Sequence, residues 1–137
     1  MASPLELRKI AICRLKEAKL LHLNGYYDGA VYLCGYVLEV ALKARICKHL
    51  KVNEYPEKIG GFKIHDFSDL LILSGLSNKI NASSNMLLFT NWNIVTTWQP
   101  DMRYKPVGSS TRQASEDLIS ALEDSTNGVF TFIKKRW

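Results

Sequence analysis

The first part of the chain has apolar positions spaced with the period of an α-helix. These positions are Leu7, Ala11, Leu15, Ala18 and Leu21, at steps of three and four. Ser3 and Glu6 form the pattern of a capping box around Pro4, a residue that suits a first helical turn. Asn24-Gly25 tolerate left-handed backbone geometry and so end the segment. The pattern predicts an amphipathic first helix with one buried stripe.

The next segment is apolar around most of its circumference. We predict that Tyr26-Tyr27 is a short connection, that Asp28 caps a second helix, and that this helix runs from Ala30 to about Leu50. A connection this short makes the two helices an antiparallel hairpin. Because a helix that is apolar on most sides packs on more than one side, the second helix is predicted to be the central, most buried element.

The rest of the chain predicts three shorter helices, over residues 67–74, about 86–98 and from 110 onward. Asp66 is the predicted N-cap of the first of them, and Pro100 ends the second. The last begins at Ser110-x-x-Gln113, and its stripe is Ala114, Leu118, Ala121, Val129 and Phe132. No alternating strand pattern occurs, so residues 1–137 are predicted to form a single all-α domain, an antiparallel up-and-down helical bundle of about five helices.

The size and composition of the chain fit one soluble domain. At 137 residues, of which 47% are apolar and 23% charged, the chain can bury a core without metals or disulfides. Its cysteines, Cys13, Cys34 and Cys47, are odd in number and lack CxxC spacing, which favours free thiols in a reducing compartment. No stretch approaches the ~18 continuous apolar residues of a membrane span, so we expect a cytoplasmic protein with no membrane partner.

The net charge of +5 allows an acidic partner such as RNA, a nucleotide or an acidic protein surface. Acidic residues are interleaved with the basic ones, however, which is more typical of solvated helix faces. No metal is predicted, because the histidines and cysteines offer only Cys47-x-His49 as a close pair. No cofactor is predicted either, since Gly60-Gly61-Phe62-Lys63 lacks the spacing of a phosphate-binding loop.

One face of the second helix carries the polar residues Asp28, Tyr32, Tyr36, Glu39 and Lys43, at steps of four, four, three and four. In the simpler interpretation Asp28 caps the helix, Glu39 pairs with Lys43, and the tyrosines pack with their hydroxyls in water. Alternatively, this face forms a pocket for a polar ligand or a groove at the contact between two copies. The simpler interpretation is favoured, and the sequence leaves both open.

Two further pairs can carry chemistry. His65 beside Asp66 at a helix start can transfer a proton or hold a phosphate, although a helix cap and a packed histidine explain the same pair. Arg103-Tyr104 can supply a guanidinium fork for phosphate with a stacking ring, or else anchor a loop on the domain. The structural role is favoured for both pairs.

Four motifs together resemble the HEPN domain family. They are Gly25-Tyr26-Tyr27-Asp28-Gly29-Ala30, Leu38-Glu39-Val40-Ala41-Leu42-Lys43-Ala44, His65-Asp66-Phe67 and Arg103-Tyr104, in the order typical of the family and over most of the chain. The resemblance implies a bundle of about four to five helices and frequent homodimers. It also implies roles in toxin-antitoxin pairs, in phage defence, or in partnership with a nucleotidyltransferase.

The ribonuclease members of that family carry the motif R-x(4-6)-H, and this chain departs from it. Arg103 has no histidine after it. Arg45 and His49 are separated by three residues, lie on the second helix, and are best explained as a solvated helix end. The resemblance therefore implies a HEPN domain without the usual ribonuclease chemistry.

We expect a non-catalytic binding module, a homodimer that engages a partner protein, a nucleotide or RNA through the face from Asp28 to Lys43 and the Arg103-Tyr104 loop. The alternative is a divergent, metal-independent ribonuclease toxin. In that alternative His49 or His65 acts as acid or base, and Arg45 or Arg103 stabilises phosphate charge. A third hypothesis is a structural subunit that uses the same surfaces without a small ligand.

Overall fold

The computed structural model describes residues 2–62 and 64–137, and within these ranges the chain is helical and contains no strand. Its elements are, in chain order, α1 (Pro4–Leu23), α2 (Tyr27–Leu50), the 3₁₀ helix η1 (Gly60–Phe62), α3 (Phe67–Leu73), α4 (Met86–Val95), the 3₁₀ helix η2 (Pro100–Tyr104), α5 (Arg112–Glu123) and α6 (Val129–Lys134). The predicted all-α helical bundle is confirmed, with six α-helices in the described part where about five were expected. None of the described helices is both long enough and apolar enough to cross a membrane.

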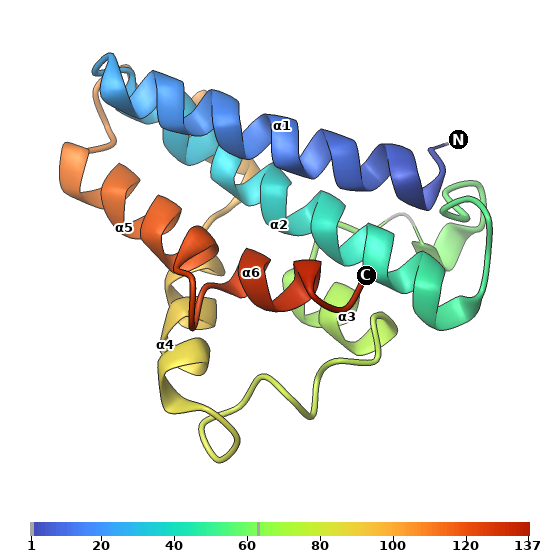
Figure 1. Cartoon of the computed structure of the whole chain (residues 1–137). Coiled ribbons are helices and arrows are strands. Elements are labelled where there is room, and N and C mark those ends of the chain that lie inside the picture. Colours follow the sequence, from blue (N-terminus) through green and yellow to red (C-terminus); the bar gives the residue numbers. More distant parts are fainter. Residues whose placement is uncertain (1, 63) are drawn as a thin grey trace.

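α1 and α2 form the antiparallel hairpin that the sequence predicts (Figure 1). The Ser3 hydroxyl accepts a hydrogen bond from the Glu6 backbone N–H at 3.2 Å, and the Glu6 carboxylate accepts one from the Ser3 N–H at 3.3 Å. These two bonds are the predicted capping box. The chain leaves α1 at Asn24 and turns through Gly25, whose φ of +81° is accessible to glycine without steric strain.

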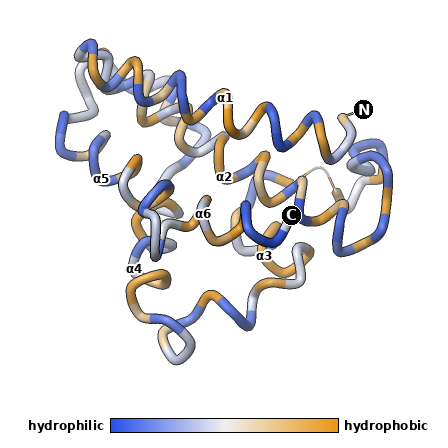
Figure 2. Tube along the Cα trace, viewed as in Figure 1, coloured by the Kyte–Doolittle hydropathy of each residue, from blue (hydrophilic) through white to orange (hydrophobic). Residues whose placement is uncertain are grey.

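α2 is the central element of the bundle, as predicted. It packs against α1, α3, α5 and α6, and its side chains Leu38, Leu42 and Ile46 are fully buried. Cutting such a side chain back to alanine costs about 2–5 kcal/mol, so these positions hold the fold together. The chain becomes hydrophilic where it leaves the C-terminal end of α2 and enters the loop before η1 (Figure 2).

The start of α2 differs from the prediction. The N-cap position belongs to Tyr26, which makes no side-chain cap hydrogen bond, and Tyr27 is already the first helical residue. Asp28 therefore lies in the first turn and does not cap the helix, because its carboxylate binds a loop 80 positions further along the chain. An acidic residue in a first turn is still favourable, since the helix dipole is positive at that end.

Two helix boundaries in the second half of the chain also differ from the prediction. α4 ends at Val95 instead of about Trp98. The cap of α5 is not Ser110 but Thr111, whose hydroxyl accepts a hydrogen bond from the Ala114 N–H at 3.0 Å. Of the predicted stripe of α5, Leu118 and Ala121 are buried as expected, whereas Ala114 is exposed.

The predicted last helix is interrupted and forms two helices, α5 and α6. Between them the Asp124 carboxylate accepts hydrogen bonds from the N–H groups of Thr126 and Asn127, at 3.2 and 2.7 Å, and this turn breaks the helical pattern. Gly128 then stands at the N-cap of α6. A β-carbon at Gly128 would lie 2.5 Å from the Leu122 carbonyl oxygen, so only glycine fits where the chain passes this close to the end of α5.

An aromatic cluster fixes the segment after α4 on α2. The Trp98 side chain is 3% exposed and lies against the backbone of Gly35, where a β-carbon would be 2.0 Å from the ring carbon Cδ2. The ring is flanked by Tyr32, Tyr36 and Phe67, at centroid distances of 6.2, 5.3 and 5.9 Å. Because η2 follows closely after Trp98, this contact positions the segment that carries the candidate site.

Candidate ligand-binding site

A cavity of about 620 Å³ opens between the N-terminal half of α2, the end of α4, η2 and the start of α5. Its volume lies within the range of roughly 300–1,000 Å³ that is usual for small-molecule sites. The apolar part of its lining comes from Val31, Ile94, Met102 and Leu118, among others. Its polar part includes Asp28 and Tyr32 of α2 and Arg103 of η2. Three of the predicted binding residues therefore meet at one cavity.

Charged side chains of both signs line this cavity. Arg103 and Lys105 contribute positive charge, and Asp117 contributes a carboxylate from α5. One oxygen of Asp117 already accepts a hydrogen bond from the Gln113 side chain at 2.7 Å. Arg103 and Lys105 are exposed, and neither takes part in an ion pair within the described residues. An apolar floor with unpaired cations at its edge suits a ligand that has an apolar part and an anionic group.

Asp28 holds the segment that closes one side of the cavity. Its two carboxylate oxygens accept hydrogen bonds from the backbone N–H groups of Gly108, at 2.6 Å, and Ser110, at 2.8 Å. Because these bonds stabilise the ionised form, they hold the pKa of Asp28 below the usual value of an aspartate. The carboxylate thus binds a loop that is distant in the sequence and does not cap its own helix.

Two tyrosines of the predicted polar face share a hydrogen bond beside the cavity. The hydroxyl oxygens of Tyr32 and Tyr36 lie 3.2 Å apart, and the rings meet edge to face with centroids 5.2 Å apart. The shared bond lowers the pKa of Tyr32, helped by hydrogen bonding with Arg103, and it raises the pKa of Tyr36. Either hydroxyl can be the donor of this bond, because each phenol can both donate and accept.

Arg103 lines the cavity, and the exposed Tyr104 ring lies next to its guanidinium. The guanidinium carbon of Arg103 lies 4.9 Å from the centroid of the Tyr104 ring, and that ring belongs to a residue that is 77% exposed. Hydrogen bonding with Tyr32 raises the pKa of Arg103, so the guanidinium is charged at any physiological pH. The side chain that packs η2 against the core is Met102. Arg103 thus faces the cavity and also contacts Tyr32 of α2, so its geometry fits both the binding role and the anchoring role.

A second cluster forms around Glu39. One carboxylate oxygen accepts a hydrogen bond from Lys43 at 3.4 Å, and the other accepts one from His65 Nδ1 at 2.7 Å. The Glu39 and Lys43 side chains are each 8% exposed, whereas that of His65 is 65% exposed. The Lys43 ammonium also lies 5.0 Å from the centroid of the Tyr55 ring. The predicted pair at i and i+4 is confirmed, and it is buried and bound by a histidine from outside α2.

The predicted polar face of α2 is therefore divided between two places. Asp28 and Tyr32 line the cavity, whereas Glu39 and Lys43 belong to the second cluster. Asp66 belongs to neither, because it caps α3 as predicted and accepts a hydrogen bond from the Asp69 N–H at 3.0 Å.

The side chains of Arg45 and His49 both contact other parts of the fold. The Arg45 guanidinium donates hydrogen bonds to the backbone carbonyls of Ser74, at 3.1 Å, and Arg136, at 2.8 Å. It is half-buried, so the prediction of a solvated helix end is wrong for Arg45, which ties the end of α3 and the C-terminal segment to α2. His49 is exposed and packs against Gly75, where a β-carbon would lie 2.5 Å from the imidazole ring. Arg45 is thus already occupied by backbone carbonyls.

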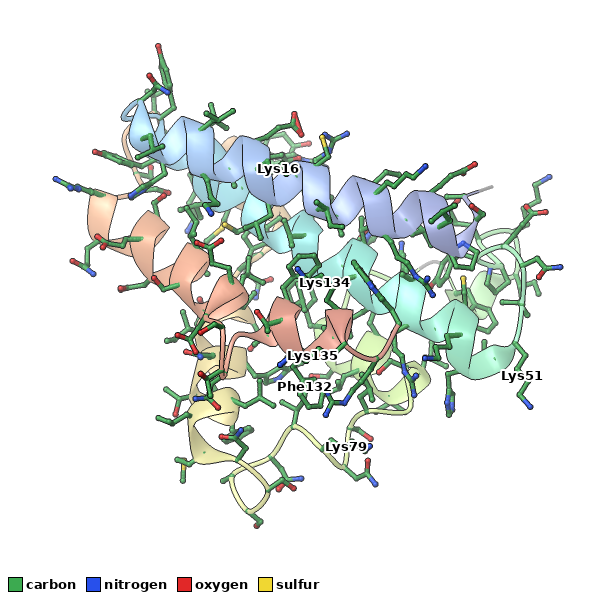
Figure 3. All side chains as sticks on the ribbon, viewed as in Figure 1. Lys16, Lys51, Lys79, Phe132, Lys134 and Lys135 are labelled. Atoms are coloured by element: carbon green, nitrogen blue, oxygen red, sulfur yellow. The ribbon has the colours of Figure 1, made fainter. Side chains whose placement is uncertain are left out.

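The basic residues outside the cavity are spread over several elements. Figure 3 shows Lys16 on α1, Lys51 after α2, Lys79 before α4 and Lys134-Lys135 at the end of α6. Other basic side chains are paired, as in the ion pair between Lys19 and Glu123 at 2.9 Å. This distribution agrees with the interpretation of solvated helix faces.

Sequence reasoning missed Lys105, Asp117 and the segment after η2. Lys105 directly follows Arg103-Tyr104, so a run of cation, ring and cation was a usable pattern for phosphate and base recognition. Asp117 lies on an ordinary amphipathic helix, and nothing in its local sequence marks it. The segment after η2 lacks a pattern of its own because the side chain that holds it, Asp28, is far away in the sequence.

Comparison of the chain with models of protein families, with curated proteins and with solved structures finds no match. In the part of the chain that the structure describes, no three side chains of His, Cys, Asp or Glu lie close enough together to hold a metal ion. Most of the predicted binding residues lie in the cavity or in the Glu39 cluster.

Proposed function

We propose that this chain is a non-catalytic binding module of the HEPN type, acting as a homodimer, which engages a nucleotide or RNA through the cavity beside η2. The observation that carries the proposal is the meeting of Tyr32, Arg103 and Lys105 around an apolar floor. The floor suits a nucleobase and the cations suit a phosphate. The exposed Tyr104 ring next to Arg103 offers a surface on which a further base can stack.

Contacts between the family-like motifs support the HEPN assignment. Asp28 and Arg103, from two of the motifs, line one cavity, and the His65-Asp66-Phe67 motif reaches α2 through the bond between His65 and Glu39. Motifs that are distant in sequence thus contact α2 at two places, the cavity and the Glu39 cluster. The resemblance extends the proposal to a toxin-antitoxin or phage-defence setting, with a nucleotidyltransferase or another protein as partner.

The non-catalytic part of the proposal depends on the surroundings of the two arginines. Arg45 donates to two backbone carbonyls, and no histidine is among the described residues that line the cavity beside Arg103. Cleavage of RNA by general acid–base catalysis needs a proton acceptor within hydrogen-bond reach of the reacting hydroxyl. A cation with an aromatic ring and no adjacent imidazole is suited to binding.

The test is a titration of the purified protein with a fluorescent ATP analogue and with a labelled, 5′-phosphorylated RNA oligonucleotide. We expect saturable binding that Arg103→Ala weakens by about tenfold or more, because a hydrogen bond to a charged group contributes about 1.5–3 kcal/mol. Arg112→Ala is the matched control, since Arg112 is exposed at the start of α5 and does not line the cavity.

Failure of both probes to saturate, or an equal loss with Arg103→Ala and Arg112→Ala, would contradict the binding function. Binding of the RNA alone would restrict the ligand to a polynucleotide. The homodimer is tested separately by light scattering after size exclusion, where a mass that stays at one chain across concentrations removes that part of the proposal.

A second candidate function is the divergent ribonuclease, and the bond between His65 and Glu39 is the observation that favours it. A buried carboxylate at 2.7 Å from Nδ1 orients the imidazole and leaves Nε2 on the exposed side of the ring. This is the arrangement of a general base whose proton acceptor faces solvent. The nearest described cation, Lys43, is buried and already paired with Glu39, so it is less suited to stabilise a phosphate.

Incubation of a labelled structured RNA with the protein in the presence of a metal chelator separates the two candidates. The binding function predicts that the RNA stays intact at high protein concentration. Cleavage that survives purification, is lost in His65→Ala and persists in His49→Ala would instead establish the ribonuclease. His49 is the matched control because it is an exposed histidine on the same helix as Glu39.

A further inference from the structure

The segment 105–110, called here the wall segment, closes one side of the cavity and has little packing of its own. Val107 at its tip is 99% exposed, and Gly108 has a φ of +85°. Within the segment, Ser109 bonds only to Pro106. Residues 106–110 make two described hydrogen bonds to another element, and the acceptor in both is the Asp28 carboxylate.

Asp28 is well placed to hold this segment. It lies in the first turn of α2, the most buried helix, so its backbone cannot follow a moving loop. Each of its carboxylate oxygens accepts one backbone N–H, from Gly108 and from Ser110. Hydrogen bonds to an ionised acceptor are roughly twice as strong as those between neutral groups.

We infer that Asp28 is the positioning residue of the cavity: its carboxylate holds the wall segment in the conformation that keeps Lys105 at the cavity edge, and ligand affinity depends on that contact. The inference rests on the proposed function for its ligand, a nucleotide. The role is one of position because the carboxylate acts through backbone groups of the loop and carries a charge of the same sign as the ligand's phosphate.

The sign of the effect distinguishes this role from simple electrostatics. The charged side chains that share the cavity with Asp28 are Arg103, Lys105 and Asp117. If charge alone mattered, removing the Asp28 carboxylate would make the cavity more positive and tighten the binding of an anion. If Asp28 positions the wall segment, Asp28→Asn weakens binding, because an asparagine has one acceptor oxygen and turns an N–H donor toward one of the two backbone N–H groups.

The experiment measures two properties of Asp28→Asn, the amide hydrogen exchange of Gly108 and Ser110 by NMR and the affinity for the fluorescent ATP analogue. We expect exchange of both amides to accelerate by about tenfold or more, and affinity to fall by a similar factor. The midpoint of thermal unfolding should fall only slightly, because the lost charge also stabilised the start of α2. Asp117→Asn removes a carboxylate from the same cavity without touching the wall segment, and should tighten binding. Asp124→Asn removes a carboxylate that also accepts two backbone N–H groups, outside the cavity, and should leave affinity unchanged.

A pH titration is a second test of the contact between Asp28 and the wall segment. Because the folded-state pKa of Asp28 is lowered, the two bonds are complete above the usual aspartate pKa of about 3.9 and are lost as pH falls through the lowered value. The amide chemical shifts of Gly108 and Ser110 should therefore stay constant down to about pH 4 and then move together.

Unchanged exchange at Gly108 and Ser110 in Asp28→Asn overturns the inference, whatever the affinity does. Faster exchange with equal or tighter nucleotide binding also overturns it, since the wall segment would then not govern the cavity. If the wild-type protein binds no nucleotide, the proposed function fails, and the exchange data still decide whether Asp28 holds the segment.

Discussion

Gly35→Ala should lower the free energy of unfolding by about 3–5 kcal/mol, close to the cost of removing a buried tryptophan. A β-carbon at this position would lie 2.0, 2.1 and 2.6 Å from three carbons of the Trp98 ring, so the ring has to leave its place. The loss is large against the roughly 5–15 kcal/mol by which ordinary domains are stable. Denaturant unfolding followed by tryptophan fluorescence measures it.

Gly60→Ala is the matched control for Gly35→Ala. No atom lies within 4 Å of a β-carbon built at Gly60, and its φ is not in the left-handed region, so its stability should change by less than about 0.5 kcal/mol. Equal stabilities of the two variants would mean that Trp98 does not pack on α2 as described. Under the proposed function, displacement of Trp98 should also weaken nucleotide binding, because η2 and Arg103 follow it in the chain.

Glu39→Leu should destabilise the fold by about 3–5 kcal/mol, because it leaves the ammonium of Lys43 buried without its carboxylate. Both side chains are 8% exposed, so water cannot replace the lost partner. The double variant Glu39→Leu with Lys43→Met should recover most of the loss, since an apolar pair of similar volume often matches a buried ion pair in stability. A double-mutant cycle by urea unfolding measures the coupling directly.

The surface pair of Arg14 and Glu17 provides the control for the Glu39 cycle. Its side chains are 39% and 46% exposed, so Glu17→Ala should change stability by no more than about 1 kcal/mol. A loss in Glu39→Leu as small as that in Glu17→Ala would show that Lys43 reaches solvent. A double variant no more stable than Glu39→Leu alone would show that packing, and not charge, causes the loss.

Much of the helical architecture follows from the sequence alone. The capping box of Ser3 and Glu6, the cap at Asp66 and the pair of Glu39 and Lys43 were predicted and are confirmed. The central position of α2 was predicted from its nearly continuous apolar circumference and is also confirmed. In each case the interacting groups lie within about one helical turn of each other, or the property is set by composition, so a local pattern contains the information.

The errors fall where a distant group competes with a local one. Asp28 has the position expected of a cap, yet its carboxylate binds N–H groups 80 and 82 residues away. Arg45 looks like a solvated residue near a helix end, yet it donates to carbonyls 29 and 91 residues away. The boundary between α5 and α6 was missed because Gly128 is required by a close approach to Leu122, which periodicity does not reveal.

The same distinction between local patterns and contacts with distant groups applies to the candidate site. The sequence by itself determined the helices, the buried core of α2 and the residue types with binding chemistry, Tyr32, Arg103 and Tyr104 among them, because these depend on local spacing and side-chain chemistry. Only the tertiary structure decided that Tyr32, Arg103 and Lys105 share one cavity, that Glu39 and His65 belong to another cluster, and that Asp28 holds the wall segment. Those relations join groups that are distant in the chain, and packing around α2 is what brings such groups within hydrogen-bond reach.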